Sequence, residues 1–365
     1  MRLLLTGGGT AGHINPAIAI AKYAQSVDKN CEILFVGKRG GMESRLVPAE
    51  GFNIEYVDVE GFSRKLNLST VSTAFKLVGA IKKASGIIKE FKPDAVIGTG
   101  GYVCVPAVVA ANRKGIPTLI HEQNVFPGSA IKMLSKKSTI TAISFEESKK
   151  YLIGAKNIVL TGNPVRQSLL NVDRNTARKK LGIESDEKYI VAFGGSLGAK
   201  KINEVISQYI GVINNKKGIK LCFATGINNY DAVMNDIKKS GITIGDNIDV
   251  RKYIDNMDVV MNAADLVISR SGAITVSELC VLGIPSILVP SPYVTNNHQE
   301  FNARALSDKS ASTMILEKDF DIESLLKEAE EILSGKAQIM SVNAMEIGQS
   351  DATEIIYKQL KNVII

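Results

Sequence analysis

Three histidines, His13, His121 and His298, lie beside glycine, amide or carboxylate residues rather than in apolar helical stretches. His13 ends a run of glycines and precedes a predicted helix, so it is placed near the positive end of a helix dipole. That position disfavours the charged imidazolium and favours a neutral ring that can accept a proton. An isolated histidine is more often structural, but these surroundings make His13 our candidate for a general base.

Two glycine-rich turns have the composition of anion-binding loops. The first reads Gly-Gly-Gly-Thr-Ala-Gly-His over residues 7–13, and the second reads Gly-Gly-Ser-Leu-Gly-Ala over residues 194–199. Each follows an apolar run and opens a helical pattern, so backbone N–H groups can approach an anion where side chains are missing. One such turn is commonly only a tight connection. Two in similar surroundings indicate two nucleotide-binding-type halves, which we expect to face one cleft.

The segment 270–278, Arg-Ser-Gly-Ala-Ile-Thr-Val-Ser-Glu, carries the sharpest signal in the second half. Gly272 permits a close backbone turn, and residues 273–276 would then present first-turn N–H groups to a phosphate. Glu278, one turn further on, can accept two hydroxyls of a ribose. In an alternative interpretation, Ser271 or Thr275 forms a capping box with Glu278. The two interpretations do not exclude each other.

Three further loops place polar residues after predicted strands. Residues 98–102 read Gly-Thr-Gly-Gly-Tyr, residues 121–124 read His-Glu-Gln-Asn, and residues 296–300 read Asn-Asn-His-Gln-Glu. Open parallel sheets bind ligands at the carboxyl ends of their strands, where such loops lie. The amides of residues 296–300 are suited to a diphosphate or to sugar hydroxyls.

No metal site is required by these motifs. The Asp-x-Asp sequence at residues 319–321 precedes an amphipathic pattern and is more simply a negative charge at a helix N-terminus. Neither glycine turn ends in the Gly-Lys-Ser/Thr of a Walker loop, and the first lacks the spacing of a dinucleotide fingerprint. We expect no tightly bound cofactor and see no evident metal requirement.

Apolar strand-like runs alternate with amphipathic helical patterns along the whole chain. This alternation is typical of parallel sheets covered by helices on both faces, and it predicts an α/β protein with doubly wound sheets. The predicted strands cover residues 3–5, 32–36, 54–59, 95–97, 118–120 and 158–160, then 190–193, 220–223, 248–250, 266–268 and 286–289.

The chain of 365 residues is too long for one comfortable core and fits two domains. We place their boundary at Pro164, because proline disfavours helical geometry at the preceding residue and can start the next helix. The first domain then covers residues 1–163 and the second residues 164–346. A further hinge is expected near residues 335–341. The amphipathic stretch 353–360, within a C-terminal segment of about 347–365, is expected to return to the first domain.

Charge and cysteine content narrow the possible partners and the compartment. Residues 1–163 contain 21 Lys and Arg against 12 Asp and Glu, whereas the rest contains 23 against 25. The basic half lacks a basic run interleaved with aromatic residues, so we expect no nucleic acid but an anionic membrane surface or a phosphorylated ligand. Four separated cysteines and the absence of a signal pattern or a 20-residue apolar stretch indicate a reduced cytosol.

The stretch 74–83 combines an apolar helical face with Lys76, Lys82 and Lys83 at its edges, and Arg64 and Lys65 precede it. Such a helix can lie on an anionic bilayer. A core-packed helix with a solvated lysine face explains the same pattern equally well.

Six ordered motifs together resemble the MurG family of peptidoglycan glycosyltransferases along essentially the whole chain. They lie at residues 8–13, 100–103, 121–124, 162–166, 194–199 and 270–278. The resemblance implies a GT-B fold with two Rossmann-like domains facing a central cleft. It also implies transfer of N-acetylglucosamine from UDP-GlcNAc to the C4 hydroxyl of the muramyl-pentapeptide in lipid I, with inversion, which forms lipid II. Peptidoglycan synthesis of this kind supports cell-wall growth, cell shape and cell division at the cytoplasmic face of the cell membrane, where a member of this family would be peripheral.

The resemblance also implies a set of site residues. His13 matches the histidine proposed as base in the family. Residues expected near the acceptor or its diphosphate are Gly100, Gly101, Tyr102, His121 and Glu122. Residues expected to bind UDP-GlcNAc are Thr10, Ala11, Gly12, Asn124, Arg166, Ser196, Ile254, Ala273, Ile274, Thr275, Val276, Ser277, Glu278 and Gln299.

One residue departs from the family pattern, and two rival functions stay open. Ala11 replaces a glycine of the usual turn, so either its φ is ordinary or the loop shifts, since alanine at a positive φ costs about 1 kcal/mol. A related GT-B enzyme acting on another lipid, such as diacylglycerol, would share the donor motifs. A non-catalytic sugar-nucleotide-binding subunit is disfavoured, because both halves and His13 are present in one chain.

Overall fold

The computed structural model describes residues 1–59 and 68–364, with side chains from residue 75 onward in the second range. Arg64, Lys65 and residue 74 of the predicted membrane-facing stretch are therefore outside the described side chains. By its internal contacts, the chain divides into two compact units. Unit 1 comprises residues 1–165 and 351–365, and unit 2 comprises residues 166–350.

Unit 1 is built on seven parallel strands in the order β3-β2-β1-β4-β5-β6-β7. The strands are β1 (Arg2–Thr6), β2 (Glu32–Gly37), β3 (Asn53–Tyr56), β4 (Ala95–Gly98), β5 (Thr118–Glu122), β6 (Ile140–Ile143) and β7 (Ile158–Leu160). The helices are α1 (Ala11–Val27), α2 (Glu43–Ala49), α3 (Leu68–Phe91), α4 (Cys104–Arg113), α5 (Ser129–Leu134), the 3-10 helix η1 (Glu146–Tyr151) and α15 (Ala352–Lys361).

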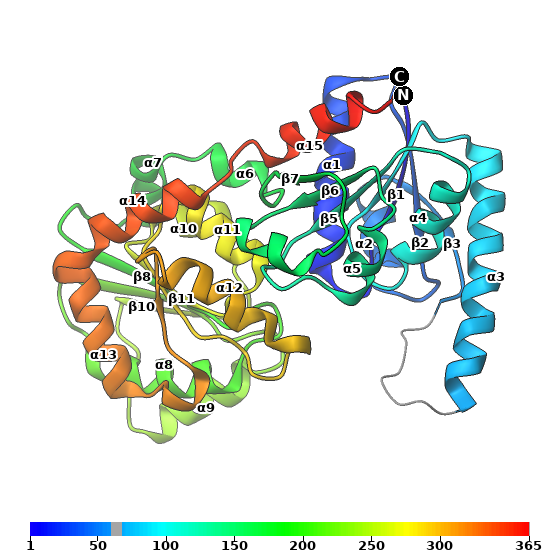
Figure 1. Ribbon diagram of the computed structural model, residues 1–365. Coiled ribbons are helices and arrows are strands. Elements are labelled where there is room, and N and C mark those ends of the chain that lie inside the picture. The colour runs from blue at the N-terminus through cyan, green and yellow to red at the C-terminus, as the bar shows by residue number, and fades with distance from the viewer. Residues whose placement is uncertain (60–67, 365) are drawn as a thin grey trace. The chain divides into compact units, whose positions relative to one another are not determined.

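Alternating residues of β1 divide the core of unit 1 into two layers. Leu3 and Leu5 pack with residues of α1 and α15, whereas Leu4 packs with residues of α3 and α4 on the opposite face. Figure 1 shows α1 on one side of the strands of unit 1 and α3 and α4 on the other. Side chains that alternate along a strand point to opposite faces, so a fully apolar strand requires helices on both sides.

The last helix of the chain packs on the first helix. Ile356 and Leu360 of α15 are fully buried in the layer that α1 covers. The rings of Tyr23 and Tyr357 meet edge to face, with centroids 5.7 Å apart. The helical stretch predicted at residues 353–360 is thus confirmed as part of α15.

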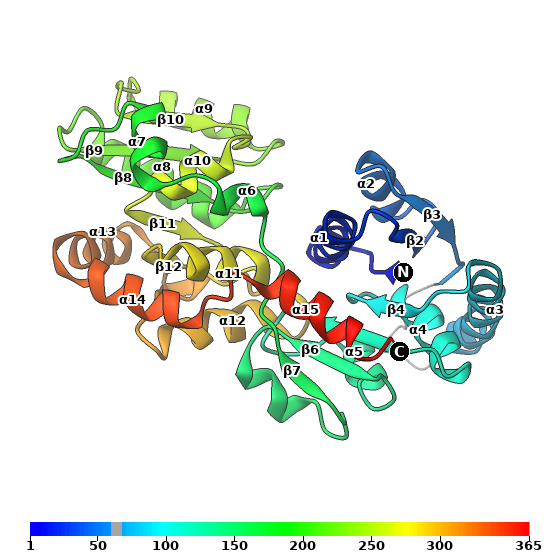
Figure 2. The same ribbon diagram turned by 90° about the horizontal axis from the view of Figure 1, so that it is seen from above.

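Unit 2 contains six parallel strands in the order β10-β9-β8-β11-β12-β13. Figure 2 shows this order from β10 to β12. The strands are β8 (Lys188–Phe193), β9 (Ile219–Ala224), β10 (Ile248–Arg251), β11 (Leu266–Ser269), β12 (Ser286–Leu288) and β13 (Thr313–Met314). Its α-helices are α6 (Gln167–Leu170), α7 (Arg174–Leu181), α8 (Lys200–Ile213), α9 (Tyr230–Lys239), α10 (Met257–Ala263), α11 (Ala273–Leu282), α12 (His298–Ser307), α13 (Ile322–Glu331) and α14 (Ala337–Ile347). Shorter turns are η2 (Thr295–Asn297), η3 (Glu317–Asp319) and the π-helical η4 (Ile332–Lys336).

Both sheets continue on each side of their first strand, which confirms the predicted doubly wound α/β architecture. Two short strands, β6 and β13, were not predicted. The prediction of a hinge near residues 335–341 was wrong, because η4 and α14 make this stretch helical. The second crossing between the units instead falls between residues 350 and 351.

Candidate active site

The first glycine turn connects β1 to α1 and brings His13 into the first turn of that helix. The Nδ1 atom of His13 lies 3.0 Å from the carbonyl oxygen of Gly8 and 3.3 Å from the Oγ1 atom of Thr10. A carbonyl oxygen only accepts, so Nδ1 is the protonated nitrogen of the neutral ring and Nε2 is its basic nitrogen. The turn therefore holds His13 in the Nδ1–H tautomer, with the basic lone pair on Nε2.

The replacement of glycine by Ala11 introduces no strain. The positive φ of this turn, 83°, falls on Gly9, whereas Ala11 is the first residue of α1 and has an ordinary φ. Thr10 is the N-cap residue with an extended φ of −145°. Of the two alternatives, the ordinary backbone angle is the correct one.

The third glycine turn, after β4, packs directly against the first. A Cβ atom on Gly101 would lie 2.3 Å from the carbonyl oxygen of Gly8, and one on Gly100 would lie 2.7 Å from the Cδ2 atom of His13. The φ angles of both glycines are also positive, 111° for Gly100 and 76° for Gly101. Glycine at these positions is required by close approach as well as by conformation, and it lets the imidazole of His13 lie close to the turn. Tyr102, the next residue, is 40% exposed.

His121 and Glu122 belong to β5, although they were predicted to lie in the loop after it. His121 is fully buried, and its Nε2–H donates to the carbonyl oxygen of Gly162 at 2.9 Å while Nδ1 accepts from the amide of Gln123 at 2.9 Å. Burial lowers the pKa of His121 to about 4, so the ring is neutral near neutral pH. These contacts give His121 a structural role in unit 1, because they connect the end of β5 to Gly162 and Gln123.

Glu122 orients the loop that follows β5. One carboxylate oxygen accepts from the backbone N–H of Asn124 at 2.9 Å, and the other accepts from that of Gly128 at 2.8 Å. Burial raises the pKa of Glu122. The side-chain amide of Asn124 also donates to Glu122, at 3.2 Å.

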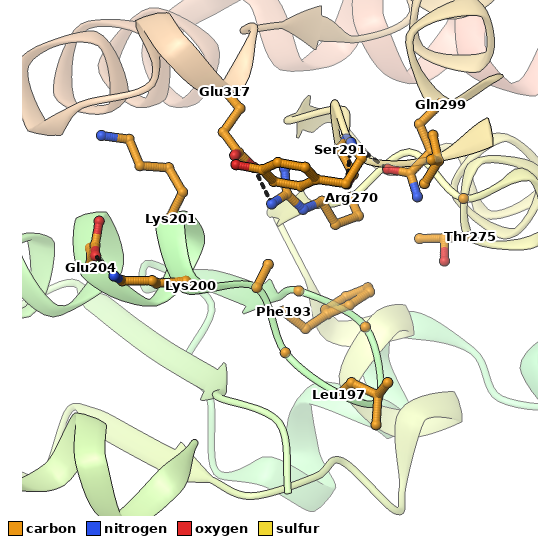
Figure 3. A pocket seen from close by; sticks show the side chains of 17 residues that line it. Phe193, Leu197, Lys200, Lys201, Glu204, Arg270, Thr275, Ser291, Gln299 and Glu317 are labelled. Carbon is orange, nitrogen blue, oxygen red and sulfur yellow. Dashed lines mark hydrogen bonds and ion pairs between the residues drawn. The ribbon is translucent and has the colours of Figure 1, made fainter. Parts of the chain in front are cut away.

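Unit 2 contains a cavity of about 780 Å³. Figure 3 shows it between the second glycine turn, the start of α11 and the segment before α12. Its lining includes Gly194, Gly195, Leu197, Gly198 and Ala199 of the turn, Gly272 and Thr275 at α11, and Ser291, Tyr293, Val294 and Gln299. The volume is in the range of ligand sites.

Cationic side chains at this cavity were missed as site residues by the sequence reasoning. Lys200 and Lys201 follow the second glycine turn at the start of α8, and Arg270 lines the opposite side (Figure 3). Arg270 donates to the carbonyl oxygen of Val289 at 3.0 Å and pairs with the carboxylate of Glu317. The Lys-Lys pair directly after a glycine turn is the feature of the sequence that could have identified the two lysines. Lys200 also lies 3.8 Å from the carboxylate of Glu204, and Glu204 and Glu317 line the same cavity. The uncapped N-terminus of α11 is therefore the feature that favours an anionic ligand.

The N-terminus of α11 is not closed by the predicted capping box. The N-cap residue is Gly272, Ser271 donates through its hydroxyl to the carbonyl oxygen of Gln299 at 2.8 Å, and no side chain caps the helix. Instead, the carboxylate of Glu278 accepts a bidentate pair from Arg166, Nε to Oε1 at 2.7 Å and Nη2 to Oε2 at 2.9 Å. The capping-box alternative is therefore wrong.

The Arg166–Glu278 pair brings together two residues predicted to touch the donor. The side chain of Glu278 is 5% exposed, whereas that of Arg166 is 48% exposed. Each carboxylate oxygen has two lone pairs, so a bidentate arginine leaves one on each for a further hydrogen-bond donor. The guanidinium thus fixes the direction in which Glu278 can accept.

The other predicted donor residues are distributed around this part of unit 2. Gln299 lines the cavity and accepts from the backbone N–H of Ser291 at 2.9 Å, as the dashed line in Figure 3 shows. Ser196 is exposed in the second glycine turn, and Ile254 is buried after β10. In α11, Ala273, Val276 and Ser277 are buried and Ile274 and Thr275 are half-buried. Gly12 and Thr10 belong to unit 1.

Among the residues that the structure describes, no group of three or more His, Cys, Asp or Glu side chains is placed to bind a metal ion. The Asp-x-Asp sequence contributes Asp321 as the N-cap of α13, where its carboxylate accepts from the backbone N–H of Ser324 at 2.8 Å. The helix-terminal role predicted for this sequence is confirmed.

Comparisons with known proteins cover nearly the whole chain. The family model of the glycosyltransferase family 28 N-terminal domain matches residues 3–143, and that of the family 28 C-terminal domain matches residues 189–358. A protein of Acetivibrio thermocellus is 49% identical over 100% of this chain and 98% of its own length. One of Bacillus cytotoxicus is 39% identical over 100% of both. Both carry the name UDP-N-acetylglucosamine–N-acetylmuramyl-(pentapeptide) pyrophosphoryl-undecaprenol N-acetylglucosamine transferase.

The solved structures include a near-complete match. The crystal structure of Acinetobacter baumannii MurG superimposes with a TM-score of 0.80 at 28% identity and covers 99% of each chain. A UDP-GlcNAc 2-epimerase from Neisseria meningitidis, at 17% identity and a TM-score of 0.67, shares the fold.

Proposed function

The chain belongs to the MurG family within glycosyltransferase family 28, and from this membership we propose the reaction that it catalyses. It is an inverting hexosyltransferase that moves N-acetylglucosamine from UDP-GlcNAc to the C4 hydroxyl of the muramyl-pentapeptide in lipid I. The products are lipid II, the precursor for peptidoglycan, and UDP. The observation that carries this proposal is the full-length identity of 49% to a relative named for this activity.

Unit 2 binds the donor in this proposal. Residues 273–278 and Gln299 hold the nucleotide and the sugar, with Ser196 and the backbone at Ile254 assisting. Thr275 and Gln299 line the cavity of unit 2, which supports this assignment because amide N–H groups at the start of α8 and α11 favour a diphosphate. The Arg166–Glu278 pair supports recognition of the ribose.

Unit 1 binds the acceptor and supplies the base. Nε2 of His13 removes the proton from the acceptor C4 hydroxyl as its oxygen attacks the anomeric carbon, and the bond from that carbon to UDP breaks on the opposite face. The leaving diphosphate carries the electron pair and is stabilised by N–H donors and cations. Gly100, Gly101 and Tyr102 border the base in this proposal. Thr10, Ala11, Gly12 and Asn124 are the residues of unit 1 that we propose to contact UDP-GlcNAc.

The proposed location is the cytoplasmic face of the cell membrane. No helix in the described part of the chain is both long and apolar enough to cross a membrane. Phe75 and Val78 of α3 are 75% and 67% exposed, and Lys82 and Lys83 lie exposed on the same helix. Apolar side chains edged by cations support peripheral attachment to anionic lipid.

One assay tests the reaction directly. Purified protein is incubated with UDP-GlcNAc and a lipid I analogue, with and without chelator, and UDP release and lipid II formation are measured. Transfer to the lipid I analogue in the absence of another protein is the expected result. Transfer to diacylglycerol instead would favour the other lipid acceptor, and UDP-GlcNAc binding without release of UDP would favour a non-catalytic subunit.

A further inference from the structure

A buried carboxylate outside the predicted site lies behind the first glycine turn. Glu43, the first residue of α2, is 1% exposed. Its Oε2 atom accepts from the backbone N–H of Gly9 at 3.1 Å, and its Oε1 atom accepts from that of Lys38 at 2.9 Å. A buried carboxylate requires such donors, and these two connect the turn after β1 to the turn after β2.

Glycines surround this carboxylate closely. A Cβ atom on Gly8 or Gly41 would lie 2.6 Å from atoms of the Glu43 carboxyl group, and one on Gly37 would lie 2.7 Å from its Cγ atom. Real Cβ atoms do not approach other atoms so closely. The space that these three glycines leave is therefore filled by the Glu43 side chain.

One peptide group joins Glu43 to His13. The N–H of Gly9, which donates to Glu43, and the carbonyl of Gly8, which accepts from Nδ1 of His13 at 3.0 Å, belong to the same planar amide. A hydrogen bond from the N–H to a carboxylate polarises an amide and makes its oxygen a stronger acceptor. A single amide group thus connects the Glu43 carboxylate to the imidazole ring.

We propose that Glu43 is a positioning residue for His13, which acts through the Gly8–Gly9 peptide group to keep the imidazole proton on Nδ1 and the basic lone pair on Nε2. The role is that of the third group that orients a catalytic base, with a peptide placed between carboxylate and imidazole. This inference rests on the proposed function, in which His13 is the base. Further contacts also hold His13: Gly100 packs close to the ring, Thr10 Oγ1 lies 3.3 Å from Nδ1, and Thr99 Oγ1 donates to the His13 carbonyl oxygen at 2.7 Å.

The test measures the tautomer of His13 directly by NMR. The full chain is labelled with ¹⁵N-histidine, and the ring-nitrogen shifts of the wild type, Glu43→Gln and Glu50→Gln are compared at a pH where His13 is neutral. The chain has three histidines, so His13→Ala assigns the resonances. Gln keeps the shape of Glu43 but lacks its charge, and Glu50, at the C-terminus of the same helix, is exposed and pairs with Lys22.

We expect wild type and E50Q to show the Nδ1–H tautomer at His13, and E43Q to shift toward a mixture of tautomers while His121 and His298 keep their shifts. In the transfer assay, E43Q should lower kcat about tenfold with KM for UDP-GlcNAc unchanged within about twofold, because most of the proposed donor-binding residues lie in unit 2. Should E43Q fold poorly, Glu43→Asp is compared with the wild type in its place. Aspartate keeps the negative charge but is one methylene shorter, so its carboxylate lies further from the N–H of Gly9.

Wild-type ¹⁵N shifts at His13 in E43Q and E43D would overturn the proposal, and so would displaced resonances of all three histidines, which would indicate a general structural role. The tautomer measurement needs no substrate. A tautomer shift in a protein that transfers no sugar would therefore refute the proposed function while retaining the coupling between Glu43 and His13.

Discussion

At the scale of single residues, our proposal depends on two side chains: His13 removes the proton, and the carboxylate of Glu278 recognises the ribose. His13 is held by the backbone carbonyl of Gly8 and packs closely against Gly100. Glu278 is held by Arg166 and is almost fully buried. Both groups are thus fixed in direction before a ligand arrives, which reduces the reorganisation needed in the transition state.

Replacement of His13 by alanine tests the base. We expect His13→Ala to lower kcat about 100-fold or more, with the affinity for UDP largely retained, because proton transfer but not nucleotide binding is lost. Initial rates with the lipid I analogue and calorimetric titration with UDP measure the two effects. Lys22→Ala, at an exposed position of the same helix, is the control. Near-normal turnover of His13→Ala would remove it from this role.

Replacement of Glu278 by glutamine tests recognition of the ribose. We expect Glu278→Gln to weaken UDP binding about tenfold or more, since the bidentate pair with Arg166 and one ionic acceptor are lost. The effect on folding should be small, because the half-exposed guanidinium of Arg166 can be solvated by water. Glu354→Gln, which breaks the exposed pair with Lys358, should leave UDP affinity unchanged. An unaltered dissociation constant in the Glu278 variant would contradict the assignment.

At the scale of elements, the end of β5 is tied to the segment by which the chain leaves unit 1. His121 donates to Gly162, Ser144 donates through its hydroxyl to the side-chain oxygen of Asn163 at 2.8 Å, and the Asn163 amide donates to the carbonyl oxygen of Gln123 at 3.0 Å. All these groups are buried. Fully satisfied buried networks of this kind specify one arrangement of the backbone.

This network predicts a loss of stability in mild acid. The pKa of His121 is about 4 in the folded protein and about 6.5 in the unfolded chain, so the unfolded state binds more protons between these values. Stability should therefore fall as the pH decreases from about 6.5 toward 4, and His121 alone should account for about 2 kcal/mol between pH 7.5 and pH 5.

Denaturant unfolding of the wild type and His121→Gln at the two pH values measures this effect. The variant should lose less stability on acidification than the wild type, whereas His298→Gln, a replacement outside the network, should behave like the wild type. Equal losses in all three proteins would show that His121 does not titrate as its burial requires.

At the scale of the whole molecule, each unit has its own core and its own sheet, but the chain contributes to unit 1 twice. The family 28 C-terminal domain match runs to residue 358, whereas residues 351–365 belong by their contacts to unit 1. Unit 1 also carries the exposed apolar residues of α3 among lysines. These are the features on which attachment to the membrane depends in our proposal.

Vesicle sedimentation at low salt tests this attachment. We expect the wild type to bind phosphatidylglycerol vesicles and the double variant Phe75→Ser/Val78→Ser to bind them about tenfold more weakly, because two exposed apolar side chains are lost. Ile339→Ser replaces a similarly exposed residue, 64%, in unit 2 and should bind like the wild type. No binding of the wild type, or binding equal to that of the double variant, would remove α3 from this role.

The sequence by itself determined the two-domain parallel architecture, because apolar runs at strand length and glycine turns depend only on local residue types. It also pointed to His13, residues 273–278 and the glycine turns. Tertiary structure decided what no local pattern records: that His121 is buried within β5, that Arg166 pairs with Glu278 across 112 residues, that Arg270 and two lysines line a cavity, and that Glu43 lies behind the Gly8–Gly9 peptide. Such pairings depend on which strand ends become neighbours when the sheets form.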